Sequence, residues 1–83
     1  MDKLDAMHMF VRVVETGSFT KVAQEFATTQ PTVTKQIAAM EARLKVRLFN
    51  RSARSVALTD IGQRYVERIA PALAQIKSAG EEA

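Results

Sequence analysis

Apolar residues in the first third of the chain recur at the three- and four-residue spacing of amphipathic helices. The first group predicts a helix over roughly residues 3–16, which Gly17 can end because glycine adopts the left-handed conformation readily. The second group predicts a short helix that ends near Phe26 and has Ser18 as its N-cap. The apolar positions of these two helices are Leu4, Met7, Phe10, Val11, Val14, Phe19, Val22, Ala23 and Phe26.

The stretch "TTQPT", residues 28–32, leaves room for a tight turn before a third apolar group. The members of this group follow one another after four, three and four residues and predict a third helix: Val33, Ile37, Met40 and Leu44. Thr29 is its predicted N-cap. Pro31 fits the first helical turn, because the N–H that proline lacks has no intrahelical partner there.

Beyond Leu44 the helical pattern stops, and two short apolar stretches, residues 48–50 and 56–58, flank a polar turn. They predict a small β-hairpin. Thr59 then caps a last helix, whose apolar stripe is Ile61, Tyr65, Ile69, Leu73 and Ile76. Pro71 is expected to kink this helix or to weaken one of its turns, and the chain beyond Ser78 is expected to fray.

The predicted order is helix, short helix, tight turn, longer helix, hairpin and helix, which is the order of a winged helix-turn-helix. We therefore predict a mainly α fold with three helices and a hairpin wing over residues 1–59, followed by a long helix over residues 60–83. The helix-turn-helix spans about residues 19–38 and the wing about residues 48–58. In this fold the third helix enters the DNA major groove.

The composition suits one small globular domain, because the chain has 83 residues of which 47% are apolar and 25% charged. No apolar run has the length of a membrane span and the N-terminus lacks the apolar centre of a signal peptide, so a cytoplasmic protein is expected. The absence of cysteine removes disulfides and thiolate metal sites. With one histidine and no glycine-rich phosphate loop, neither an enzyme nor a cofactor or metal site is expected.

The basic residues concentrate in the middle of the chain. Residues 26–59 hold six of them against Glu41 alone, a charge of +5, whereas residues 1–25 and 60–83 each hold three basic and four acidic residues, a charge of −1. Such a block favours a phosphate-bearing partner, and an ordinary solvated face is the alternative. The six residues are Lys35, Arg43, Lys45, Arg47, Arg51 and Arg54.

The third helix presents small residues on the side opposite its apolar stripe. At about 100° per residue, this outward face holds Pro31, Lys35, Ala38, Ala39 and Ala42, with Thr32 and Thr34 on its shoulders. Alanines allow a helix to approach another surface closely. The pattern favours DNA as that surface, and packing on a helix of another protein is the alternative.

Several short motifs carry a resemblance to a known family: Gly17-Ser18-Phe19-Thr20, Gln30-Pro31, Gln36-Ile37, Leu48-Phe49, Leu58-Thr59 and Gly62. The chain resembles the N-terminal DNA-binding domain of the LysR-type transcriptional regulators, from "LDAMHMFVRVVETGSFTKVAQEF" through "TTQPTVTKQIAAMEARLKVRLFNRSARSVALTDIG". The resemblance implies a bacterial regulator that binds double-stranded DNA as a dimer or tetramer. It also implies that the last helix is a linker to a C-terminal domain, outside this chain, that binds a small-molecule effector.

One departure from the family concerns Lys45, which stands where the resemblance implies a glycine. A lysine in the left-handed conformation costs on the order of 1 kcal/mol. We therefore expect the third helix to end in another way at this position.

Helix position and resemblance together suggest roles for individual side chains. The candidates for contacts with bases in the major groove are Gln30, Pro31, Thr32 and Lys35. The candidates for phosphate contacts are Thr29, Thr34 and Arg51. Arg54 is the candidate for the minor groove, although either wing arginine can instead pair with an acidic group of the domain.

The apolar stripe of the last helix extends over four turns, and three helices with a hairpin leave little core to cover it. A second copy of the chain is the expected cover, in a homodimer through Ile61, Tyr65, Ile69, Leu73 and Ile76. Two-fold pairing sets two recognition helices at a fixed separation, which matches a pseudo-palindromic operator. A winged helix that makes only protein–protein contacts and does not read DNA is the alternative function.

Overall fold

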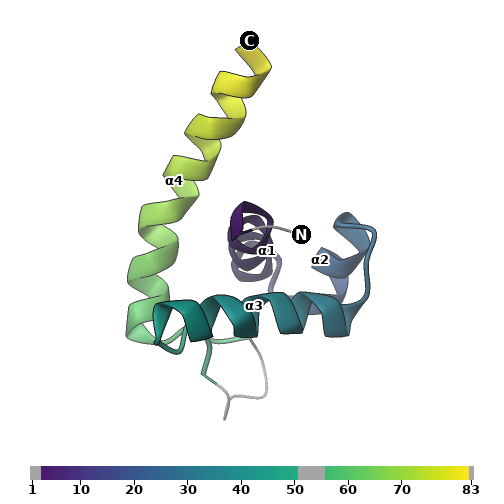
Figure 1. The fold of residues 1–83 in the computed structure, drawn as a ribbon, viewed down its shortest axis with the longest axis vertical. Helices are drawn as coiled ribbons and strands as arrows, with labels where there is room; N and C mark the ends of the chain where they lie inside the picture. The colour runs from purple at the N-terminus through teal and green to yellow at the C-terminus, as the bar shows by residue number, and fades with distance from the viewer. Residues whose placement is uncertain (1–2, 51–55, 83) are drawn as a thin grey trace.

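Four helices make up the fold in the computed structural model, which describes residues 3–50 and 56–82. They are α1 (Lys3–Thr16), α2 (Phe19–Glu25), α3 (Gln30–Leu44) and α4 (Asp60–Glu82). Figure 1 shows α1 lying across the middle of α3, α2 near the first residues of α3, and α4 rising from the other end of α3 and projecting beyond the other helices. The predicted order and bounds of the first three helices are confirmed.

The predicted caps are present at the starts of α2 and α3. Ser18 has an extended backbone, and its hydroxyl accepts a hydrogen bond from the Lys21 N–H at 3.1 Å. The Thr29 hydroxyl likewise accepts a hydrogen bond from the Thr32 N–H at 3.3 Å. Pro31 lies in the first turn of α3, as expected. Because each cap satisfies an N–H that has no partner within its helix, these polar residues fix where the helices begin.

The end of α3 differs from the prediction, because Lys45 adopts the left-handed conformation with φ 59° and ψ 35°. In this conformation its N–H donates to the Ala42 carbonyl at 3.3 Å, and the Val46 N–H donates to the Glu41 carbonyl at 3.2 Å. These bonds satisfy two carbonyls of the last turn, and a cation at a helix C-terminus interacts favourably with the helix dipole. Both effects offset the conformational cost that led us to expect another ending.

The core lies between α1, α2 and α3 and extends to the chain leading into the wing. Its largest fully buried side chains are Met9, Phe10, Val13, Val22, Val33, Ile37, Met40 and Leu48. The Phe10 ring meets the rings of Phe49 and Tyr65, with centroids 5.4 and 5.8 Å apart, and so connects α1 to the wing and to α4. Leu44, predicted to point inward, is 39% exposed, because it is the last residue of α3 and α1 crosses that helix further back (Figure 1).

The two predicted arms of the wing pair in antiparallel fashion. Phe49 and Leu58 form a bridge, and the Asn50 N–H donates to the Ala57 carbonyl at 2.8 Å. Within the described residues this bridge is the full extent of the β-structure. The predicted turn over residues 51–55, with Arg51 and Arg54, lies outside the described residues.

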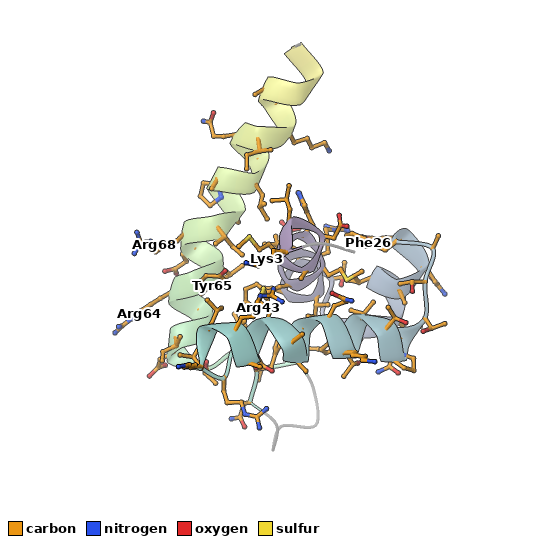
Figure 2. All side chains as sticks on the ribbon, viewed as in Figure 1. Lys3, Phe26, Arg43, Arg64, Tyr65 and Arg68 are labelled. Atoms are coloured by element: carbon orange, nitrogen blue, oxygen red, sulfur yellow. The ribbon has the colours of Figure 1, made fainter. Side chains whose placement is uncertain are left out.

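The last helix, α4, spans Asp60–Glu82, close to the predicted residues 60–83, and it continues through Pro71 and past Ser78, where we expected the chain to fray. Its first half packs on the core, and Figure 2 shows Tyr65 directed from α4 toward α1 while Arg64 and Arg68 point away from the other helices. None of the helices described in the structure is long and apolar enough to cross a membrane.

Candidate nucleic-acid interface

The outward face of α3 has the exposure that the sequence predicts. Val33, Ile37 and Met40 are buried on the inner side of the helix. The residues of the opposite side are exposed: Pro31, Lys35, Ala38, Ala39 and Ala42. Within residues 3–50 and 56–82 no ion pair involves Lys35. A flat, small-residue surface with an available cation therefore runs along the helix.

Hydroxyl and amide groups gather at the N-terminal end of α3. The Thr29 and Thr32 hydroxyls lie 2.9 Å apart, and Gln30 Nε2 lies 3.5 Å from the Thr34 hydroxyl. Gln30 is exposed, whereas Thr32 and Thr34 are half-buried. The Thr29 oxygen is already used to cap the helix. This end of the helix therefore combines the positive end of the helix dipole with polar groups held in place by one another.

Sequence analysis did not foresee a role for Glu41, which joins α3 to the wing. Its side chain is only 4% exposed, and Oε2 accepts hydrogen bonds from the Leu48 N–H at 2.7 Å and the Phe49 N–H at 3.3 Å. Oε1 lies 3.9 Å from Arg47 Nη1. The signal was available, since a lone acidic residue in a basic block, placed beside the apolar stripe, needs a local partner.

Thr59 and Gly62 attach α4 to Arg47 and Leu48, the residues that lead from α3 into the wing. The Thr59 hydroxyl donates to the Arg47 carbonyl at 2.6 Å and accepts from the Gly62 N–H at 3.0 Å, and the Thr59 N–H donates to the Leu48 carbonyl at 3.0 Å. The predicted cap is therefore present, and Thr59 also binds the base of the wing, which we define as residues 47–49. Gly62 lies so close to the Leu48 carbonyl that a Cβ there would collide with it. Together with Glu41, these contacts fix α3, the wing base and α4 relative to one another.

An ion-pair network on the surface joins α1 to α2. Arg12 donates to both carboxylate oxygens of Glu25, at 2.9 and 2.7 Å, and to Glu15 at 2.9 Å. The hydrogen bonds from Arg12 lower the pKa of the Glu25 carboxyl. All three groups are exposed to solvent, so the network adds little to stability.

The apolar stripe of α4 divides into a covered and an uncovered part. Leu73 is 5% exposed and belongs to the chain's own core, and Tyr65 and Ile69 are half-buried against it. Ile61 and Ile76 are 48% and 53% exposed. The expectation that the domain has too little core to cover the stripe is therefore wrong for Leu73, because α1 packs along α4, and it holds for Ile61 and Ile76.

No group of three histidine, cysteine, aspartate or glutamate side chains in the described part of the chain is arranged to hold a metal ion. The residues brought together are instead threonines, a glutamine, a lysine and alanines on one helix, beside a wing base that carries Arg47. Such a surface can form hydrogen bonds to base edges and phosphates without covalent chemistry.

Comparison with known proteins identifies this architecture. Residues 4–63 match the model of the family described as bacterial regulatory helix-turn-helix protein, lysR family. The chain belongs to the LysR family. Because this is a family of transcription regulators, the expectation that the chain is not an enzyme is confirmed, as is the expected winged helix-turn-helix fold.

Two curated relatives and two solved structures illustrate the match. A transcriptional repressor of Pseudomonas aeruginosa is 41% identical over 76 residues, which are 92% of this chain and 24% of that protein. The transcriptional activator AaeR of Escherichia coli is 33% identical over 82 residues, which are 99% of this chain and 26% of that protein. The chain thus spans about a quarter of the length of these relatives.

The structural match concerns the DNA-binding domain itself. The DNA-binding domain (DBD) of BenM, solved in complex with catB site 1 DNA, superposes on this chain with a TM-score of 0.89 at 30% identity. The match covers 96% of this chain and 86% of the BenM chain. Full-length CbnR, solved in complex with its target DNA, superposes with a TM-score of 0.82 at 30% identity over 98% of this chain and 28% of the CbnR chain. This chain therefore corresponds to the DNA-binding domain of a LysR-type regulator.

Proposed function

We propose that this chain is the DNA-binding portion of a bacterial LysR-type transcriptional regulator and binds double-stranded DNA sequence-specifically, with α3 in the major groove. The observation that carries the proposal is the exposed face of α3, where alanines permit close approach and Lys35 supplies a long cationic side chain. Similarity to a LysR-type domain solved on DNA supports it.

In this proposal the side chains of α3 divide between bases and phosphates. Gln30 and Lys35 hydrogen-bond to base edges, while Pro31 and Thr32 touch thymine methyl groups. Thr29 and Thr34 bind phosphates beside the positive end of the helix dipole. In the wing, Arg51 binds a phosphate and Arg54 enters the minor groove.

Replacing Gln30 or Lys35 by alanine is expected to reduce the affinity for a preferred sequence by about 1–3 kcal/mol for a bidentate contact, and the affinity for a scrambled duplex by less. The preferred sequence is first selected by the wild-type chain from a random pool, and binding is then measured by fluorescence anisotropy. Lys77→Ala, which removes an exposed charge from α4, is the control. If both alanine variants keep the full preference for the selected sequence, α3 does not read bases through these residues.

A module that only contacts proteins is the second candidate, and salt dependence separates the two. Phosphate contacts release counterions, so affinity for duplex DNA must fall steeply as salt rises from about 50 to 200 mM. A binding constant that does not change over this range would favour the protein-contact module.

We also propose that the DNA-binding form is a homodimer through α4. The exposed Ile61 and Ile76 and the half-buried Tyr65 and Ile69 form the contact surface, and Leu73 supports it from the core. A two-fold dimer presents two α3 helices to a pseudo-palindromic operator. In the longer protein, tetramers and a small-molecule effector bound by the C-terminal region would build on this unit, and the protein would act in the cytoplasm.

The dimer proposal predicts that Ile76→Glu raises the dissociation constant at least about tenfold, because a charge replaces an apolar side chain at the interface. Sedimentation velocity over a concentration series measures this constant. Gln75→Glu adds a charge at the adjacent exposed position, on another side of α4, and should leave it unchanged. A wild-type chain that stays monomeric at tens of micromolar would contradict the proposal.

A further inference from the structure

A recess lies beside the C-terminal half of α3, apart from the side chains assigned above. Its volume is about 420 Å³, and it is lined by Ala38, Glu41, Ala42, Lys45, Val46 and Arg47. Ala38 and Ala42 are exposed residues of the outward face of α3, and Lys45 and Arg47 are exposed cations. The recess therefore joins the small-residue surface to two positive charges.

The recess lies between α3 and the base of the wing. Lys45 is the left-handed C-cap of α3 and lines the recess together with Ala38, and the chain then runs through Val46 and Arg47 to the Phe49–Leu58 bridge. If α3 occupies a major groove and the wing occupies the next minor groove, one sugar–phosphate strand separates those two grooves. That strand must pass between α3 and the wing, which places it over the recess.

We propose that this recess seats a phosphate of the DNA strand that passes between α3 and the wing, held by Lys45 and Arg47. The inference rests on the proposed DNA binding and adds a contact to it. A phosphodiester carries one negative charge, and lysine and arginine both donate charge-assisted hydrogen bonds to phosphate oxygens. The two alanines leave room for the strand to approach the helix.

The buried carboxylate that lines the recess is held by groups of the chain itself. Glu41 lines the recess but is only 4% exposed, and its Oε2 accepts hydrogen bonds from the backbone N–H groups of Leu48 and Phe49. Its Oε1, 3.9 Å from Arg47 Nη1, orients the guanidinium, whose side chain is 68% exposed and retains N–H groups for a phosphate.

The left-handed conformation of Lys45 allows a substitution that tests the role of its side chain. A non-glycine residue at φ 59° carries a conformational cost that glycine would avoid. The two backbone hydrogen bonds at this helix end offset part of that cost, and a glycine at this position would keep both of them. The substitution Lys45→Gly therefore separates the two roles, because it relieves the backbone while removing the cation.

The test measures the binding of a fixed mixed-sequence duplex between about 50 and 200 mM salt. The double variant Lys45→Gly with Arg47→Gln should lose one phosphate contact. The slope of log K against log salt should then be smaller in magnitude by about 0.9, so that the fourfold rise in salt reduces the affinity of the variant roughly 3.5-fold less than that of the wild type. Lys45→Gly alone should bind more weakly while its melting temperature changes little, because the relief of the left-handed backbone and the loss of the dipole interaction are of similar size. The matched control is Lys77→Gln with Arg68→Gln, which also removes one lysine and one arginine charge, but from α4, and should keep the wild-type slope.

Three outcomes decide whether the recess seats a phosphate. A smaller slope in the recess variant alone supports the phosphate seat. An unchanged slope in the recess variant, or an equal reduction in the control, overturns the seat while leaving DNA binding by α3 in place. A wild-type chain whose duplex affinity is independent of salt overturns the proposed function and the seat together.

Discussion

Replacing Gly62 by alanine is expected to lower the free energy of unfolding by about 3 kcal/mol or more, because α4 packs at this residue directly against the backbone of Leu48. An added Cβ would collide with the Leu48 carbonyl oxygen and lie 3.1 Å from the Leu58 side chain. The carbonyl cannot move aside freely, since it accepts the Thr59 N–H at 3.0 Å. For a domain of this size the melting temperature should fall by on the order of 10 °C or more.

Gly80→Ala is the matched control, because it makes the same substitution in the same helix. A Cβ at Gly80 would meet nothing within 4 Å, and alanine is favoured over glycine in a helix by up to about 1 kcal/mol. Its stability should therefore stay the same or rise. Thermal unfolding followed by circular dichroism compares the two variants, and a Gly62→Ala chain as stable as Gly80→Ala would show that α4 does not pack on Leu48 in this way.

The helices and their starts could be predicted from the sequence because their causes are local. An apolar stripe at helical period predicts α1 to α3, and Ser18 and Thr29 each cap a helix through an N–H three residues away. The outward face of α3 follows from the same geometry. The roles proposed for Gln30 and Lys35 add the family resemblance to this local pattern.

The ends of helices were harder to predict, because they depend on small competing energies. Lys45 was expected to avoid the left-handed conformation, yet two carbonyl hydrogen bonds and a favourable dipole interaction compensate a cost of similar size. Leu44 has the periodicity of a core residue but lies beyond the part of α3 that α1 covers. For Leu44, periodicity indicates the side of the helix on which the residue lies, but not whether another helix covers it there.

Contacts between distant segments could not be predicted. Leu73 belongs to the stripe that we assigned to a partner, but α1, more than fifty residues earlier, buries it within the chain. The same limit applies to Glu41, which accepts hydrogen bonds from two backbone N–H groups that no side-chain pattern identifies. A single sequence shows that an acidic residue stands in a basic block, but not which N–H groups it meets.

Replacing Glu41 by alanine is expected to lower the free energy of unfolding by roughly 2–5 kcal/mol. The change leaves the N–H groups of Leu48 and Phe49 without their carboxylate acceptor in a buried place, and each unsatisfied group costs about 1–3 kcal/mol. Glu41→Gln retains a side-chain oxygen at this point and should cost less, because a neutral acceptor forms a weaker bond than a charged one. The predicted order of stability is wild type, then Glu41→Gln, then Glu41→Ala.

Glu67→Ala is the control for the loss of a carboxylate, since Glu67 is exposed on α4 and bonds only one side chain in the described part of the structure, that of Gln63. Urea unfolding of the four chains gives the free energies directly. If Glu41→Ala costs no more than Glu67→Ala, the carboxylate does not hold the wing base. If the predicted order is found, α3 itself positions the wing, because the carboxylate of Glu41 anchors the wing base while the exposed side of the helix is the proposed DNA-binding face.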